Sequence, residues 1–156
     1  MDKVDLMRRT IALCKERLAD GSGAYCASIV VKDGTIVGEG VNNVMLAHDP
    51  TGHCEINAIR DAGRRLKTHD LAGCELYTTW EPCVMCAAAI WWARIDRVYY
   101  ANVLGDAKRL GMDIAPLAKE VALPSEQRPR PYERLLGDEA FAVLMDWWQK
   151  SQQQAL

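Results

Sequence analysis

The sequence contains no long apolar run, no signal-like N-terminus and no excess of basic residues. No apolar stretch approaches the roughly eighteen residues that a membrane-spanning helix needs. The first residues, "MDKVDLMRRT", lack the continuous apolar segment of a secretory signal peptide, so we expect a cytoplasmic protein without membrane contact. The formal net charge is −2 and the pI is about 5.9, which argues against a dedicated nucleic-acid partner.

The chain also lacks internal repeats, low-complexity segments and a clear domain boundary. Its 156 residues are enough for one domain with a sizeable core, so we expect residues 1–156 to form a single domain. In a reducing compartment, its six cysteines are expected to be thiols or metal ligands rather than disulfides.

The hydrophobic pattern predicts an α/β fold. Apolar residues spaced by three and four between residues 4 and 18 indicate an opening helix. "ASIVVKDGTIVGEGV" predicts a hairpin that turns at Asp33–Gly34. Helical and strand patterns then alternate, in the order 53–66, 74–80, 83–95 and 97–103. We therefore expect a sandwich in which helices cover a mixed sheet.

The end of the chain has a second kind of pattern. Residues 104–131 mix a short helical stretch with the proline-rich "PSEQRPRPYE". Residues 138–151 then predict an amphipathic helix, with Phe141, Leu144 and Trp148 on its apolar face.

Two short motifs carry metal-binding side chains. Cys83 and Cys86 follow Pro82 at an expected helix start, where residues three apart share a face and free N–H groups favour thiolates. His53 stands at the start of another helix, so His53 and Glu55 can both bend over its end. We expect His53, Cys83 and Cys86 to bind one zinc ion per chain. Three protein ligands leave the fourth tetrahedral position for water, as in catalytic zinc sites.

Glu55 is the expected catalytic residue. A carboxylate beside zinc and its water can take a proton and return it to a leaving amine. One alternative is a closed structural site in which Cys54 is the fourth ligand, although adjacent residues on a helix diverge by about 100°. A second alternative is that these side chains only pack in the core, without a metal.

The motif H-x-E followed by P-C-x-x-C is the signature of zinc-dependent nucleobase and nucleoside deaminases. In "DPTGHCEINAIR", "LYTTWEPCVMCAAAIWWAR" and "VYYA", the sequence resembles the cytidine deaminase-like superfamily, and within it the bacterial guanine deaminases. The resemblance runs from about Met7 to Tyr132. It implies a three-layer α/β sandwich with a five-stranded mixed sheet flanked by helices. It also implies a homodimer, in which the C-terminal helix packs against the partner subunit or is exchanged with it.

The resemblance assigns the zinc ligands and the proton shuttle to the residues named above. It also implies four positions that contact the substrate, namely Asn42, Trp92, Asp113 and Cys26. Three of them fit structural roles as well: Asn42 suits a turn, Trp92 a helix core and Asp113 a solvated helix cap.

The sequence departs from the family pattern in ways that bear on the substrate. Cys54 stands where the family usually has alanine. Tyr25 and Cys26 stand where it has proline and phenylalanine, and Ile114 stands in place of a second carboxylate. The chain also ends without the aromatic residue that can plug a neighbouring subunit's site. The pattern therefore defines the chemistry better than the substrate.

We predict a hydrolase that acts on the C–N bond of a cyclic amidine. The leading hypothesis is zinc-dependent deamination of guanine to xanthine and ammonia, a step of purine metabolism. One alternative is deamination of another amino-heterocycle or nucleoside, such as a triazine, a pterin, guanosine or cytosine. The other is a tRNA adenosine deaminase, which "EPCVMC" and basic runs such as "GRRLK" favour but the acidic pI disfavours.

Overall fold

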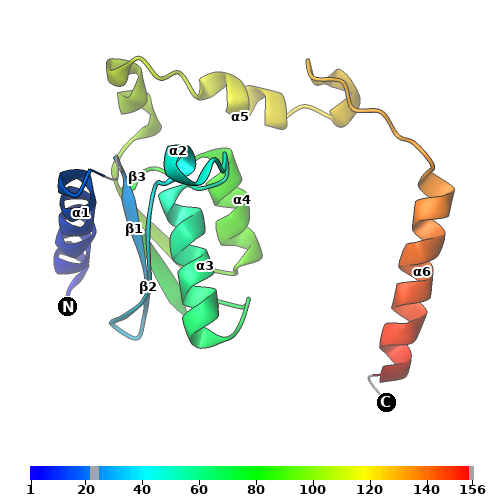
Figure 1. Cartoon of the computed structure of the whole chain (residues 1–156), viewed down its shortest axis with the longest axis horizontal. Coiled ribbons are helices and arrows are strands. Elements are labelled where there is room, and N and C mark those ends of the chain that lie inside the picture. Colours follow the sequence, from blue (N-terminus) through cyan, green and yellow to red (C-terminus); the bar gives the residue numbers. More distant parts are fainter. Residues whose placement is uncertain (22–24, 155–156) are drawn as a thin grey trace. The chain divides into compact units, whose positions relative to one another are not determined.

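The computed structural model describes residues 1–21 and 25–154, and its first part is a sheet with helices on both faces (Figure 1). The strands lie in the order β2 (Thr35–Val41), β1 (Ala27–Lys32), β3 (Cys74–Trp80) and β4 (Arg97–Asn102). β1 is antiparallel to both β2 and β3, whereas β3 and β4 are parallel, so the sheet is mixed. Helix α1 (Lys3–Ala19) covers one face, and α3 (Cys54–Leu66) and α4 (Val84–Trp92) cover the other. The predicted α/β sandwich is confirmed.

The sheet has four strands in the described part of the chain, so the fifth strand implied by the resemblance is wrong. After β4 the chain forms a 3₁₀-helix, η1 (Leu104–Leu110), and a short helix, α5 (Ala115–Val121). This segment lacks the alternating β-branched residues that favour a strand, and Pro116 suits the first turn of a helix. A four-residue helix, α2 (Val44–Ala47), joins β2 to α3. No described helix is both long and apolar enough to cross a bilayer.

Strand β1 lies at the centre of the core, because both of its faces are covered. Val30 packs in a buried cluster with Ala58 of α3, whereas Ile29 and Val31 pack on the opposite face in a cluster with Leu13 of α1. Successive side chains of a strand point to opposite faces, which explains why its run of apolar residues is continuous.

The hairpin between β1 and β2 turns where the sequence predicts. Asp33 and Gly34 have φ angles of 50° and 75°. A two-residue type I′ turn needs positive φ at both positions, which Asp-Gly provides at low cost.

Two glycines allow α3 to lie directly against β2. A Cβ atom on Gly38 would lie 2.5 Å from the carbonyl oxygen of Ala58. One on Gly40 would overlap the backbone of Ala58 and Cys54. The neighbouring atoms belong to the helix backbone and cannot move aside by a change of rotamer. Because glycine has no side chain, these two positions set how closely α3 approaches β2.

The chain divides into two compact units, Met1–Ala118 and Lys119–Leu156. The second unit contains the end of α5, a short 3₁₀-helix, η2 (Ser125–Gln127), and the helix α6 (Gly137–Gln154). The predicted closing helix is confirmed as α6, and its apolar side chains are exposed in the single chain, including Phe141, Leu144 and Trp148. The single-domain organisation and the packing or exchange of α6 with a partner stay predictions.

The contact between β2 and α3 can be tested with Gly40→Ala. The added methyl group must push the helix backbone away, and such overpacking costs about 1–3 kcal/mol of unfolding free energy. Gly105→Ala is the matched control, because its Cβ would meet only Val103 Cγ2, at 3.9 Å. Denaturant unfolding of both variants measures the difference. Equal stability of the two variants would show that α3 is not held by this contact.

Candidate functional site

The starts of α3 and α4 bring three metal-binding side chains together. His53 is the N-cap residue of α3, Cys83 is that of α4, and Cys86 lies in the first turn of α4. His53 Nδ1 lies 3.6 Å from Cys83 Sγ and 3.4 Å from Cys86 Sγ, and the two Sγ atoms are 3.6 Å apart. Within residues 1–21 and 25–154, no other group of three histidine, cysteine or carboxylate side chains converges in this way.

These separations fit a tetrahedral zinc ion. With Zn–N bonds of about 2.0 Å and Zn–S bonds of about 2.3 Å, tetrahedral angles place nitrogen and sulfur about 3.6 Å apart and two sulfurs about 3.8 Å apart. All three observed separations lie within about 0.2 Å of these values. The three side chains thus match the donor set of a zinc site with one position left for water.

The electrostatics of the cluster favour a bound cation. Hydrogen bonds with Cys86 and His53 hold the pKa of the Cys83 thiol at about 4. The pKa of Cys86 is raised instead, first by its hydrogen bond with Cys83, then by burial and by the negative charge of Glu55. The hydrogen bond with Cys83 also raises the pKa of His53. A metal ion would replace the protons that these groups share, because zinc binds thiolates and neutral imidazole.

Glu55 is buried beside this cluster, with 4% of its surface exposed. Its Oε2 accepts a hydrogen bond from the Cys54 thiol at 3.2 Å. The Cys54 sulfur is fully buried and also lies 3.9 Å from Thr78 Oγ1. Cys54 is therefore directed at Glu55 and does not belong to the converging ligand set. This arrangement favours an open metal site over the closed site with Cys54 as fourth ligand.

Two of the predicted substrate residues lie next to the site. Asn42 directly follows β2, is buried, and donates a hydrogen bond from Nδ2 to the Tyr25 hydroxyl at 3.3 Å. Its backbone N–H donates to the carbonyl of Cys26 at 3.1 Å. Cys26 is buried too. The pKa of the Cys54 thiol is raised first by the burial of Cys54 and then by its hydrogen bond with Cys26. Contact of Asn42 and Cys26 with a substrate stays a prediction.

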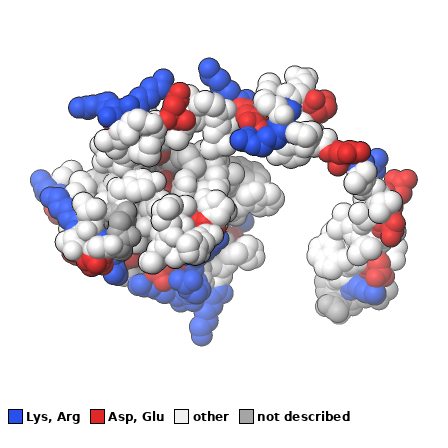
Figure 2. Space-filling model, turned by 45° about the horizontal axis from the view of Figure 1, so that its top comes forward, with Lys and Arg blue, Asp and Glu red and all other residues white. Residues whose placement is uncertain are grey.

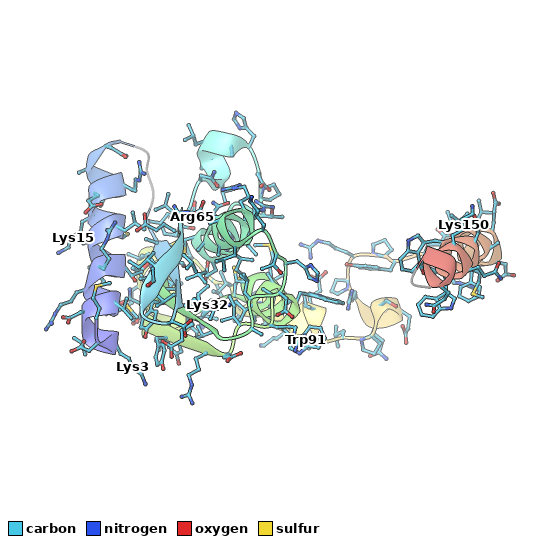
Figure 3. All side chains as sticks on the ribbon, turned by 90° about the horizontal axis from the view of Figure 1, so that it is seen from below. Lys3, Lys15, Lys32, Arg65, Trp91 and Lys150 are labelled. Atoms are coloured by element: carbon cyan, nitrogen blue, oxygen red, sulfur yellow. The ribbon has the colours of Figure 1, made fainter. Side chains whose placement is uncertain are left out.

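The single chain does not bring Trp92 to this cluster. Trp92 ends α4, about 9 Å of helix beyond Cys86, and 74% of its surface is exposed. Its ring meets that of Trp91 edge-on, with centroids 5.1 Å apart. Figure 3 shows Trp91 on the outer side of α4. A substrate contact by Trp92 stays a prediction.

Asp113 caps the start of α5, which is the structural role that its position in the sequence allows. It is exposed, and its Oδ1 accepts a hydrogen bond from the backbone N–H of Ala115, the first residue of α5. Such a contact satisfies one of the free donors at a helix start. The predicted contact of Asp113 with the substrate is not tested by this arrangement.

Tyr25, which the sequence marks only as a departure from the family pattern, also lies next to the site. Burial, followed by the neighbouring groups of Cys26, Cys54, Glu55 and Cys83, raises the pKa of the Tyr25 hydroxyl. The hydroxyl is in contact with Asn42, whose backbone bonds to Cys26. The sequence gives only a weak signal for a role of Tyr25, because it shows no more than a polar aromatic residue beside Cys26, just before the first strand.

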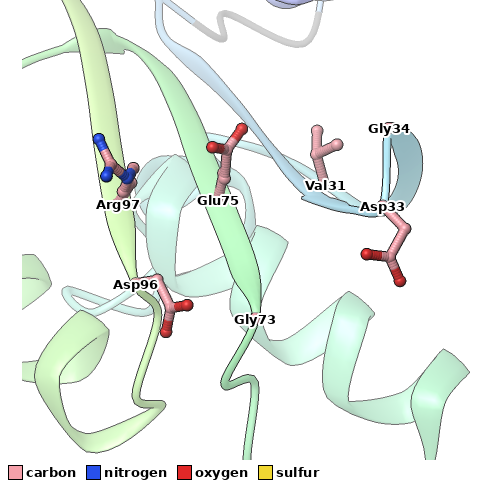
Figure 4. Close-up of a pocket in the computed structure, with 7 residues that line it drawn as sticks. All are labelled: Val31, Asp33, Gly34, Gly73, Glu75, Asp96 and Arg97. Atoms are coloured by element: carbon pink, nitrogen blue, oxygen red, sulfur yellow. The ribbon is translucent and has the colours of Figure 1, made fainter.

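A separate hollow of about 290 Å³ lies at the other end of the sheet (Figure 4). It is lined by Val31, Asp33, Gly34, Gly73, Glu75, Asp96 and Arg97. Gly73 precedes β3 whereas Cys83 follows it, so the strand separates the hollow from the metal-binding cluster. The Glu75 carboxylate accepts hydrogen bonds from the hydroxyls of Tyr77 and Tyr99. Its position and bonding give this hollow no part in the candidate site.

Comparison with known proteins points to the same residues. Residues 1–102 match the family model of the cytidine and deoxycytidylate deaminase zinc-binding region. The chain is 38% identical to guanine deaminase of Bacillus subtilis (strain 168) over 147 residues, which are 94% of each chain. The solved structure of the Bacillus subtilis guanine deaminase matches with a TM-score of 0.89, covering 96% of this chain and 95% of that one.

Two other likenesses are more limited. The structure of a guanine deaminase from Nitrosomonas europaea is 29% identical, with a TM-score of 0.68, and the match covers 74% of this chain and 66% of that one. The tRNA-specific adenosine deaminase of Aquifex aeolicus is 47% identical over 74 residues, which are 47% of this chain and 49% of that protein. The match to the tRNA enzyme thus spans about half of either chain.

The metal-binding cluster can be tested by elemental analysis. We expect close to one equivalent of zinc in the purified protein and a large loss of zinc in Cys86→Ser, because a neutral hydroxyl is a poor zinc ligand. Cys14→Ser is the matched control, since Cys14 lies on α1, outside the cluster. Full zinc content in Cys86→Ser would remove Cys86 from the ligand set.

Proposed function

Because the chain belongs to the cytidine and deoxycytidylate deaminase family, we propose that it hydrolyses guanine to xanthine and ammonia. The likeness to guanine deaminase over nearly the whole of both chains carries the substrate assignment. The three-ligand cluster beside a buried carboxylate supports the chemistry. The substrate assignment needs the overall likeness as well as the cluster, because the cluster alone could act on any aminated ring that reaches it.

His53, Cys83 and Cys86 hold the zinc ion in this proposal. When bound, the metal supplies Lewis acidity that lowers the pKa of water at its open position. The side chains of the chain position that water beside Glu55 and keep the reacting centre away from bulk solvent.

Glu55 moves the protons. The oxygen of one water molecule bonds to C2 of guanine, and the bond from C2 to the amino nitrogen breaks. Glu55 takes the two protons of the water one after the other, passing the first to the adjacent ring nitrogen and the second to the departing amino group. One hydrogen of the water thus stays on xanthine and the other leaves in ammonia. The hydrogen bond from Cys54 to Oε2 fixes the orientation of the carboxylate during these transfers.

A tRNA adenosine deaminase is the second candidate, supported by the 47% identity over half of the chain. Nucleic-acid binding usually requires a basic surface. Figure 2 shows lysine and arginine side chains at separate places, with acidic and uncharged residues between them. The net charge of −2 also favours a small, soluble substrate over a polyanion.

The proposed chemistry can be tested by ammonia release from guanine. Glu55→Gln should lower kcat about a thousandfold or more while zinc is retained, because an amide keeps the size of the side chain but cannot carry protons. Glu16→Gln, an exposed change on α1, should leave kcat unchanged. Unchanged kcat in Glu55→Gln would contradict the shuttle. Turnover of tRNA, a nucleoside, a triazine or a pterin but not guanine would contradict the substrate.

We further propose that the chain forms a cytoplasmic homodimer through the outer face of α4. Trp91 and Trp92 are 71% and 74% exposed, and large aromatic side chains are enriched in the buried centres of interfaces. Beside them lies a hollow that is also lined by His69, Asp70, Arg94 and Ile95. A second copy covering this face would remove two large apolar side chains from water.

The assembly can be tested with Trp91→Glu. A buried charge without a partner is costly, so this variant should be monomeric by light scattering at micromolar concentration, whereas the unmodified chain should be a dimer. Leu18→Glu changes a residue on α1 that is 59% exposed, and it should stay dimeric. A monomeric unmodified chain would contradict the proposal.

A further inference from the structure

We propose that Tyr25 is a specificity-determining residue, whose hydroxyl is held by a hydrogen bond from Asn42 and donates its own proton to the carbonyl oxygen of guanine. The inference rests on the proposed function, because it names a contact to that substrate. It concerns a position at which this sequence departs from the family pattern.

The orientation of the Asn42 amide follows from its backbone neighbour. The backbone N–H of Val44 donates to Asn42 Oδ1 at 3.4 Å. A backbone N–H can only donate, so the amide oxygen of Asn42 must face Val44 and its nitrogen must face the other way. That nitrogen, Nδ2, lies 3.3 Å from the Tyr25 hydroxyl. Tyr25 therefore accepts a hydrogen bond from Asn42 and does not donate one.

The hydroxyl of Tyr25 consequently keeps its own proton for another partner. A phenol offers one donor and two lone pairs, and Asn42 uses one lone pair. Among the described residues, no acceptor takes the Tyr25 proton. Because burial and nearby negative charge raise the pKa of Tyr25, the group stays neutral and remains a donor.

The place of the Tyr25 hydroxyl suits a contact with the substrate rather than with the core. Asn42 is buried at the end of β2, whereas 51% of Tyr25 is exposed, so the pair runs from the interior toward solvent. Tyr25 bonds to Asn42, whose backbone N–H bonds to the carbonyl of Cys26. The Cys26 thiol bonds to Cys54, which donates to Glu55, so a chain of contacts links the hydroxyl to the reacting centre. A ring bound there can present one edge to Glu55 and a neighbouring edge to Tyr25.

A carbonyl oxygen is an acceptor that matches this donor. It carries two lone pairs and no proton, so it can accept a hydrogen bond from the Tyr25 hydroxyl. In guanine the carbonyl at C6 is separated from the reacting C2 by a single ring nitrogen. An aminated ring without this oxygen would leave the Tyr25 donor unpaired, which costs affinity. The Tyr25 hydroxyl should therefore select guanine over rings that lack the carbonyl.

The test compares Tyr25→Phe with the unmodified protein on guanine and on 2-aminopurine, which keeps the amino group at C2 but lacks the carbonyl. The variant retains the ring and loses only the hydroxyl. We expect kcat/KM for guanine to fall about tenfold, mostly through KM, and kcat/KM for 2-aminopurine to stay within about twofold. Where 2-aminopurine turns over too slowly, its inhibition constant provides the same comparison. Tyr99→Phe removes a hydroxyl that bonds to Glu75 on β3, away from the site, and should change neither substrate.

The outcomes separate this inference from the proposed function. Guanine turnover by the unmodified protein establishes the function before any variant is compared. An unchanged kcat/KM for guanine in Tyr25→Phe, or an equal loss with both substrates at full zinc content, would overturn the role of Tyr25 and leave the function standing. No turnover of guanine by the unmodified protein would overturn the function itself, and the Tyr25 contact with it.

Discussion

β2 and β3 lie on either side of β1, and both run antiparallel to it. They therefore point in the same direction and end at the same edge of the sheet. α3 follows β2 and α4 follows β3, so the N-termini of both helices meet at this edge. Each start supplies free backbone N–H groups and a partial positive charge, which favour thiolate and carboxylate side chains. The metal-binding cluster and Glu55 are both consequences of this meeting of two helix starts.

The precision of the site depends on how closely α3 approaches the sheet. Gly38 and Gly40 let the helix backbone lie against β2, and a side chain at either position would push it outward. His53 precedes the first residue of that helix and Glu55 is its second residue, so both would move with it. The Cys54 thiol then fixes Glu55 from the buried side. Ligand placement and proton transfer are thus linked through the position of one helix.

The parts of the fold and site that could be predicted from the sequence are those set by local geometry. Asp33–Gly34 defines its own turn, and the short spacings of His53 with Glu55 and of Cys83 with Cys86 are fixed by the first turn of a helix. The spatial closeness of the two motifs was inferred from their complementary zinc-binding side chains and agrees with the resemblance, since periodicity cannot bring residues 30 apart together.

The remaining features depend on longer-range arrangement. The implied fifth strand had no matching residue pattern, and residues 104–121 form helical turns instead. Trp92 lies at the far end of α4 and is exposed in the single chain, so its helix position alone does not bring it to the metal-binding cluster. Tyr25 lies outside any helix or strand, where no periodic pattern marks a buried polar contact.

X-ray absorption at the zinc edge of the purified protein tests the open metal site most directly. Two sulfur ligands at about 2.3 Å and two nitrogen or oxygen ligands at about 2.0–2.1 Å are expected, one from His53 and one from water. Three sulfur ligands would show that Cys54 joins the metal and closes the site. That result would contradict the account of a centre open to water beside Glu55.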